Sequence, residues 1–132
     1  MEATLTENGV RTLTENGAGW VHDFKPSLQV INLLNVKKKS DDTDRYRVIL
    51  SDGHHFCQGC FVSNLNELAN RIVTNNIIRI NEYCINSIKG HLVCGIFSCD
   101  IIDSNMTETI GSPINVDECY RNGYSQWESS NK

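Results

Sequence analysis

The 132-residue chain lacks the features that mark a membrane protein, a linker-rich protein or a common class of enzyme. No window of about 18 apolar residues could span a bilayer, and the first 24 residues contain no apolar run flanked by basic residues, so no secretory signal is expected. Only two prolines are present, which argues against a long rigid linker. The sequence also has no glycine-rich phosphate loop, no nucleophile elbow and no two-histidine metal helix. We therefore expect an intracellular binding domain without catalytic activity, cofactor or membrane association.

The net charge of −4 is unevenly distributed along the chain. Between residues 25 and 100, nine Lys or Arg stand against seven Asp or Glu, whereas the two ends together carry three basic and nine acidic residues. A mildly basic centre favours an acidic peptide or a phosphate group as ligand. The excess of two positive charges is too small to hold nucleic acid by charge alone.

Six cysteines are present, and without secretion we expect free thiols. Cys57 and Cys60 have the spacing of half a zinc site, which Cys94 and Cys99 could complete. Cysteines three or five residues apart on a strand point to opposite faces, because side chains alternate along a strand. The sequence therefore favours structural thiols over a metal site.

Hydrophobic periodicity predicts a short helix, three strands, a second short helix, two further strands and a tail. Thr6 is the expected cap of the first helix, which Gly17 ends, and Asn64 is the expected cap of the second. The strands are expected at residues 28–36, 45–50, 56–62, 77–88 and 92–102. This order, with one helix between the third and fourth strands, is that of the OB-fold, a small five-stranded Greek-key barrel.

The domain organisation follows from this assignment. We expect a helix and connector that pack on the barrel (1–24), the barrel itself (25–103), a segment that closes it (104–116) and an acidic, disordered tail or linker (117–132).

The second strand carries the strongest indication of a binding site. Tyr46, Val48 and Leu50 share one face, which feeds the core, whereas Arg45 and Arg47 point together from the other. OB-folds bind ligands across strands two and three, between the loop that joins strands one and two and the loop that joins strands four and five. Those loops hold Lys37, Lys38 and Lys39 in the first, and Lys89 and His91 in the second. The positive charge therefore converges on the expected groove.

Two motifs indicate a family. Lys-Pro-x-Leu-Gln-Val-Ile-Asn occupies residues 25–32, and Arg-Tyr-Arg-x-x-x-Ser-Asp-Gly occupies residues 45–53. Together with the stretches 5–7, 81–89 and 110–113, they resemble the N-terminal domain of the large subunit of replication protein A. The resemblance implies a nuclear protein-interaction domain of a complex that binds single-stranded DNA in replication and repair. Its partners would be acidic amphipathic segments of DNA-damage-response proteins, while the remaining subunits of that complex would bind parts of the large subunit outside this chain.

The resemblance also implies a set of groove residues. Arg45, Arg47 and Lys89 match basic groove positions of the family, and Gln58, Cys60 and Ser63 fall on the wall formed by strand three. Leu34 stands where the family has an arginine, and Gly90 or His91 stands where it has another, so we expect a weaker or differently shaped groove. An apolar stripe on the partner would cover Ile49, and Lys37 to Lys39 form a secondary basic loop.

Three alternatives remain open at this stage. Arg45 and Arg47 could form an ordinary solvated strand face. The groove could instead bind single-stranded DNA or telomeric DNA weakly, although the loop between strands four and five has no aromatic residue and Phe56 and Phe61 point to opposite faces. Finally, the acidic and aromatic tail could occupy the groove, with a simple linker as the competing interpretation.

Overall fold

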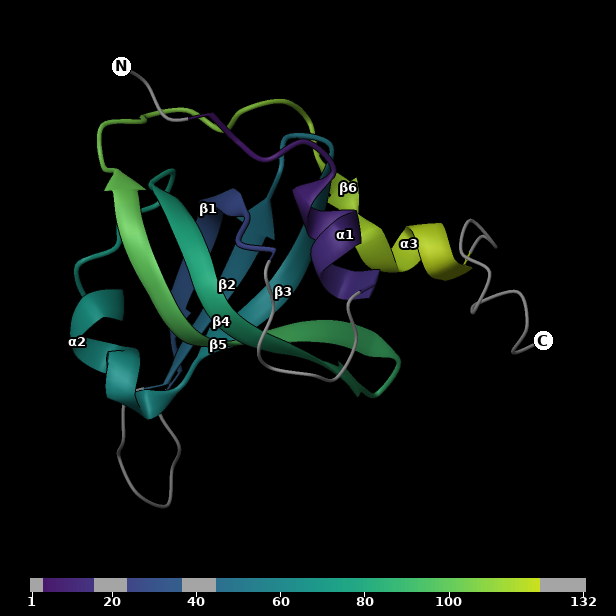
Figure 1. The fold of residues 1–132 in the computed structure, drawn as a ribbon, viewed down its shortest axis with the longest axis horizontal. Helices are drawn as coiled ribbons and strands as arrows, with labels where there is room; N and C mark the ends of the chain where they lie inside the picture. The colour runs from purple at the N-terminus through teal and green to yellow at the C-terminus, as the bar shows by residue number, and fades with distance from the viewer. Residues whose placement is uncertain (1–3, 16–23, 37–44, 122–132) are drawn as a thin grey trace.

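The computed structural model describes residues 4–15, 24–36 and 45–121. Figure 1 shows a small barrel of curved strands with short helices at its ends. The elements are α1 (Gly9–Glu15), β1 (Ser27–Asn35), β2 (Tyr46–Ser51), β3 (His55–Phe61), the 3-10 helix η1 (Ser63–Leu65), α2 (Asn66–Ala69), β4 (Ile77–Ile88), β5 (His91–Asp103), β6 (Ile114–Asn115) and α3 (Val116–Arg121). No helix in these ranges is long and apolar enough to cross a bilayer.

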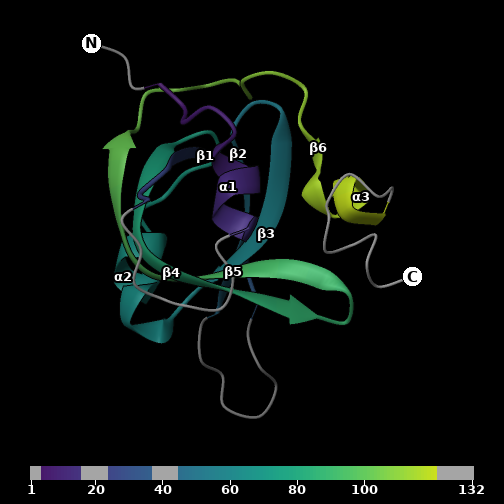
Figure 2. The same ribbon diagram turned by 45° about the vertical axis from the view of Figure 1, so that its right-hand side comes forward.

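The first five strands close into a barrel, seen from a second direction in Figure 2. β1 pairs antiparallel with β2 and with β4, β2 pairs antiparallel with β3, and β4 pairs antiparallel with β5. The barrel closes where β3 runs parallel to β5. The predicted five-stranded OB-fold is therefore confirmed, and β4 has the predicted bounds.

Alternation along β2 and β3 separates the core of the barrel from its outer face. Tyr46, Val48 and Leu50 are buried, whereas Arg47 is exposed and Ile49 is partly exposed. β3 follows the same rule: Cys57, Gly59 and Phe61 are buried, whereas Gln58 and Cys60 are partly exposed. Val48 and Leu50 pack over Gly59, where a Cβ atom would lie 3.1 Å from a Val48 methyl carbon and from the Cys94 carbonyl oxygen. A larger residue at position 59 would push β3 away from its neighbours.

Helix α1 is held by contacts distant in sequence. Val10 and Leu13 are fully buried against the barrel. The prediction of Thr6 as the helix cap was wrong, because its hydroxyl accepts a hydrogen bond from the Ser27 N–H (2.8 Å) and the helix begins three residues later. The Val10 N–H, one of the unpaired donors of the first turn, instead donates to the Asp52 carboxylate (3.1 Å). Gly17, the predicted end of this helix, lies outside the described residues.

The connection between β3 and β4 is less regular than predicted. Its helical part is divided between η1 and the four-residue α2, and no side chain caps either helix. Asn64, the predicted cap, lies inside η1. Ala69 and Ile72 are buried nonetheless, so the predicted apolar positions still contribute to the core.

The segment after β5 crosses one end of the barrel and is attached by a buried glutamine (Figure 1). Gln29 is fully buried, and its amide nitrogen donates to the carbonyl oxygens of Asn75 (3.1 Å) and Glu108 (2.8 Å). Its amide oxygen accepts from the Ile110 N–H (2.8 Å), so all of these polar groups are paired. Gly111, at φ +72°, then passes so close to Gly53 that a Cβ atom would collide with the Gly53 carbonyl oxygen.

The described part of the chain ends in a short strand and a helix. β6 pairs parallel with the start of β3 through Ile114 and Asn115. Residues 117–121, expected to belong to a disordered tail or linker, lie within α3 (Val116–Arg121). Asp117 is only 4% exposed, because it accepts hydrogen bonds from the start of β5. Residues 122–132 lie outside the described part of the chain.

Candidate functional site

The outer faces of β1, β2, β3 and β5 align in lateral rows, because partners in neighbouring strands point to the same side of a sheet. One row consists of Leu34, Arg47 and Cys60. The next row consists of Asn32, Ile49, Gln58 and Val93. Arg45 lies directly before β2, where its carbonyl oxygen accepts from the Val36 N–H. These residues form the floor of a groove of about 670 Å³.

The hairpin between β4 and β5 forms one rim of this groove. Lys89 and Gly90 make the two-residue turn with φ values of +52° and +82°, as a tight hairpin requires. Lys89 and His91 line the groove from this turn, and Ser63 lines it from η1. The structure thus brings together all nine residues predicted for the site: Leu34, Arg45, Arg47, Ile49, Gln58, Cys60, Ser63, Lys89 and His91. Their role in binding stays a prediction, and Lys37, Lys38 and Lys39 lie outside the described residues.

The groove is basic in an acidic chain. Arg45, Arg47 and Lys89 line it, and no described residue among its lining groups carries a carboxylate. Arg47 is solvent-exposed and forms no ion pair with any described residue. The apolar side chains of Leu34, 56% exposed, and Ile49, partly exposed, line the same groove. The groove therefore combines positive charge with apolar surface.

Asp117 of α3 holds the groove rim in place. One of its carboxylate oxygens accepts from the Leu92 N–H (3.1 Å), and the other lies 3.0 Å from Nδ1 of His91. His91 itself is about half exposed and faces the groove. The sequence pattern placed Asp117 in a disordered tail or linker, because its partners lie 25 and 26 residues earlier in the chain. Asn32 and Val93 were also missed, although the period of two along their strands places them beside predicted residues.

The thiols of the barrel are arranged for packing. Burial raises the pKa of Cys57 to about 12, and burial also raises the pKa of Cys94 well above its usual value. Burial raises the pKa of Cys60 as well, with a smaller contribution from Cys84, while Arg47 opposes the change. In the described ranges, no three His, Cys, Asp or Glu side chains are grouped so as to hold a metal ion.

A closed five-stranded barrel with a basic groove across β2 and β3 defines an OB-fold domain. Residues 5–104 match the family described as replication factor-A protein 1, N-terminal domain. The chain belongs to this family.

Two curated relatives from Arabidopsis thaliana, both replication protein A 70 kDa DNA-binding subunits, are similar over most of the chain. One is 26% identical over 117 residues, which cover 86% of this chain and 15% of the relative. The other is 29% identical over 119 residues, which cover 86% of this chain and 14% of the relative. The chain thus spans about one seventh of the length of these relatives.

Solved structures share the fold at low sequence identity. The Est3 telomerase subunit of the yeast Hansenula polymorpha superposes with a TM-score of 0.51 at 14% identity, covering 81% of this chain and 77% of that one. A putative aspartyl-tRNA synthetase from Leishmania major superposes with a TM-score of 0.55 at 11% identity, covering 97% of this chain and 29% of that one. At such identities these likenesses concern the fold alone.

Proposed function

We propose that this domain is a recruitment module that binds acidic amphipathic segments of DNA-damage-response proteins in the groove across β2 and β3. It would act in the nucleus, within a complex that binds single-stranded DNA, and it would catalyse no reaction. The relatives, which are DNA-binding subunits of replication protein A by name, support a place in such a complex. The observation that carries the proposal is a groove lined by Arg45, Arg47 and Lys89, without a described carboxylate, in a chain of net charge −4.

The spacing of the arginines favours a helical ligand. Arg45, directly before β2, and Arg47, on β2, both line the groove and lie two residues apart, or roughly 6.8 Å along an extended chain. Side chains four residues apart on an α-helix are separated by about 6 Å along its axis. Two carboxylates at positions i and i+4 of a bound helix can therefore each meet one arginine in a charge-assisted hydrogen bond.

The apolar part of the groove suits the other side of such a helix. Leu34, Ile49 and Val93 line the groove beside the cations. An amphipathic helix would place its apolar stripe on these residues while its acidic stripe meets the arginines. A partner that is disordered when free must fold on binding, so affinity is modest, and salt weakens the association by screening the charges.

The test compares two labelled ligands by fluorescence anisotropy at low and at physiological salt. One is an amphipathic peptide with glutamates four residues apart and a leucine stripe, and the other is a single-stranded oligonucleotide. The peptide should bind more tightly than the oligonucleotide. The Arg45→Glu, Arg47→Glu double variant should weaken peptide binding by at least about a hundredfold, since hydrogen bonds to charged groups contribute about 1.5–3 kcal/mol each. The matched control is Arg71→Glu, which reverses an exposed charge outside the groove and should leave binding unchanged.

Two results would contradict the proposal. Oligonucleotide binding that is tighter than peptide binding at physiological salt would indicate a DNA-binding OB-fold. An equal loss of peptide affinity in the double variant and in Arg71→Glu would show that the peptide responds to the net charge of the chain and not to the groove.

A further inference from the structure

Strand β5 extends well beyond its partner in the barrel. It contains 13 residues, but β3 pairs only with Val93 to Ile96, and the Val62 N–H makes the last contact by donating to the Ile96 carbonyl oxygen. From Ser98 to Asp103 the strand is paired with β4 alone, and a β-bulge leaves Ile102 without a partner there. Because of this bulge, Asp100 and Asp103 pair with Arg79 and Ile77, which share one face of β4. We call these six residues the β5 edge. Figures 1 and 2 both show this end of β5 at the margin of the barrel, with β4 on its inner side.

The β5 edge presents backbone groups that can pair with another strand. In an antiparallel ladder, alternate residues direct their N–H and C=O groups away from the partner strand, so about half of the six residues point outward. Within the described parts of the chain, no backbone hydrogen bond reaches Ser98–Asp103 from the side opposite β4. Such a row of backbone donors and acceptors is a template for the addition of an extended peptide.

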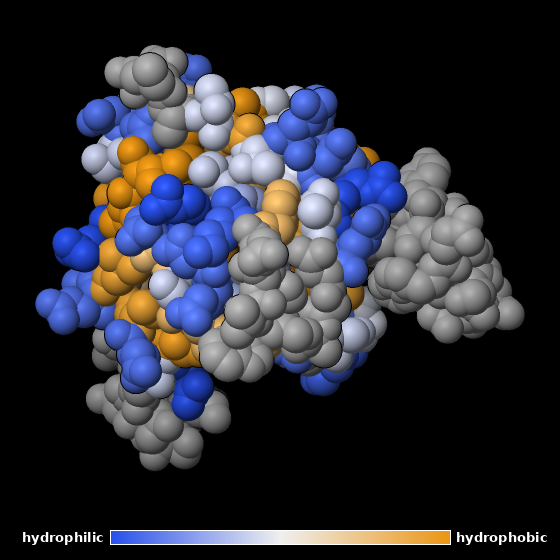
Figure 3. All heavy atoms as spheres, viewed as in Figure 1, coloured by the Kyte–Doolittle hydropathy of each residue, from blue (hydrophilic) through white to orange (hydrophobic). Residues whose placement is uncertain are grey.

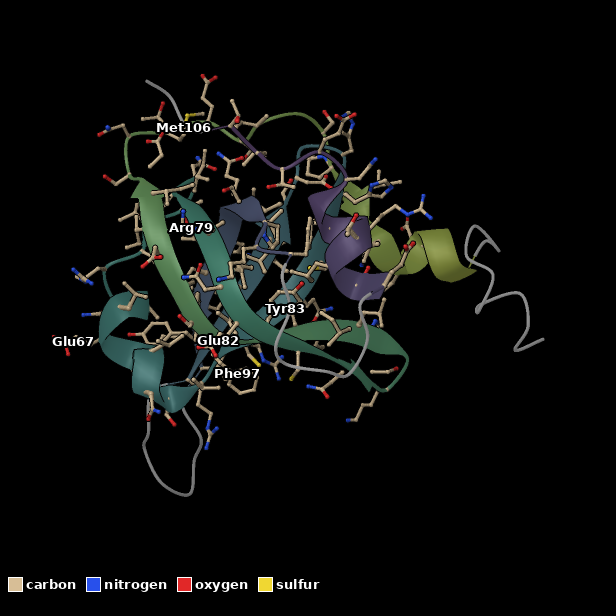
Figure 4. All side chains as sticks on the ribbon, in the orientation of Figure 1. Glu67, Arg79, Glu82, Tyr83, Phe97 and Met106 are labelled. Atoms are coloured by element: carbon tan, nitrogen blue, oxygen red, sulfur yellow. The ribbon has the colours of Figure 1, made fainter. Side chains whose placement is uncertain are left out.

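The side chains around the β5 edge select the charge of an occupant. Asp100, Asp103 and the exposed Glu82 of β4 are acidic, and Arg79 is bonded to Asp100 at 3.1 Å. Figure 4 shows Arg79 and Glu82 on the outer side of β4. Hydrogen bonds from Asn81 and then from Arg79 lower the pKa of Asp100, so its carboxylate stays charged. The net charge around the β5 edge is therefore negative, whereas the groove across β2 and β3 is positively charged.

Apolar side chains are interleaved with these acids. Ile102 is 38% exposed, and Ile101 is partly buried against the core. Figure 3 shows apolar and polar side chains intermixed along this flank of the molecule. A second copy of the chain is a poor occupant, because self-pairing would bring two aspartates from each edge into one ladder, and like charges across strands repel.

We propose that the β5 edge binds an extended segment of a protein partner in which lysine or arginine alternates with apolar residues, by adding that segment as a strand beside β5. Its backbone would pair with the outward groups of Ser98–Asp103, while its basic side chains meet Asp100 and Asp103. This site is separate from the groove across β2 and β3, so the failure of one proposal leaves the other standing.

The probe is the hexapeptide acetyl-Lys-Val-Lys-Val-Lys-Val-amide, titrated into the full ¹⁵N-labelled chain. Amide shift changes should be concentrated in Ser98–Asp103, and alternate amides there should exchange more slowly with solvent when the peptide is present. The Arg45→Glu, Arg47→Glu variant should bind the peptide as the parent chain does. Absence of shift changes in Ser98–Asp103, or changes confined to other surfaces, would overturn the proposal.

Two further probes separate strand addition from simple attraction of charges. N-methylation of either the three valines or the three lysines removes the donors along one side of the peptide, so one of these peptides should lose binding and the other should keep it. Equal binding by both would refute strand addition. Asp103→Lys should weaken peptide binding about two- to fivefold, the range of a cross-strand charge pair. Glu108→Lys reverses an exposed charge outside the β5 edge and serves as the control that should leave binding unchanged. Unchanged binding by Asp103→Lys would refute the assigned role of this carboxylate.

Discussion

Asp52 ties the turn between β2 and β3 to helix α1, and its substitution should test how the fold is held together. One carboxylate oxygen accepts from the backbone N–H groups of His54 (2.9 Å) and His55 (2.8 Å). The other accepts from the Val10 N–H at 3.1 Å, and the side chain is only 5% exposed. Asp52→Ala leaves three backbone donors without this acceptor. The free energy of unfolding should fall by about 3–5 kcal/mol, since a hydrogen bond to a charged group contributes about 1.5–3 kcal/mol and neighbouring losses are not additive.

Asp52→Asn separates the two halves of this arrangement. The amide oxygen can still accept from His54 and His55, whereas the amide nitrogen would face the Val10 N–H, so only the attachment of α1 is lost. Its cost should be about 1–2 kcal/mol, similar to the loss of a helix cap. Urea unfolding followed by circular dichroism measures both values. The control is Asp103→Ala at the partly exposed end of β5, where, among the described residues, only the Asn105 N–H loses an acceptor. Losses below about 0.5 kcal/mol for Asp52→Ala, or equal losses for the two variants, would refute the reasoning.

Three further predictions concern the barrel. In the native state at pH 8, a thiol reagent should modify the partly exposed Cys60 well before Cys57, because burial raises the pKa of Cys57 to about 12. Mass spectrometry after digestion measures the labelling, and equal labelling of the two thiols would contradict the prediction. Burial lowers the pKa of His55 below 6.5, so at slightly acidic pH this histidine binds more protons in the unfolded chain than in the folded one. The free energy of unfolding should therefore fall as the pH drops from about 7.5 to 5.5. Urea titrations should show a smaller fall in His55→Gln, and an identical fall would contradict this role. Gly111→Ala should lower the free energy of unfolding by about 2 kcal/mol or more, because position 111 combines a positive φ with a collision at the new Cβ atom. Gly90→Ala should lower it less in the same experiment, because position 90 has a positive φ but no neighbour within 4 Å.

The strands of the barrel were predictable because their determinants are local. The period of two in β2 and β3 identified which side chains face the core and which face outward, and the order of elements then identified the OB-fold. Once the topology was known, the groove followed, since Arg47 and Cys60 had to share the outer face of neighbouring strands. Val93 could have been added by the same rule.

The remaining features depend on contacts between distant parts of the chain. The start of α1 is set by Asp52, 42 residues from Val10, so local capping rules placed it too early. Gln29 looks like an ordinary strand residue, although it holds the segment around Ile110, which is 81 residues away. The two-residue β6 and the burial of Asp117 require parallel pairing with β3 and a partner on β5, neither of which has a local pattern.

The central claim is that the groove across β2 and β3 binds an acidic helix, and chemical-shift mapping tests it most directly. The ¹⁵N-labelled chain would be titrated with the amphipathic glutamate–leucine peptide, and the amide resonances would be followed at physiological salt. The account predicts shift changes concentrated in Arg47, Ile49, Gln58 and Cys60, with little change in the β5 edge and loss of the changes in the Arg45→Glu, Arg47→Glu variant. Shift changes centred on another surface, or a peptide that leaves these four residues unaffected, would contradict it.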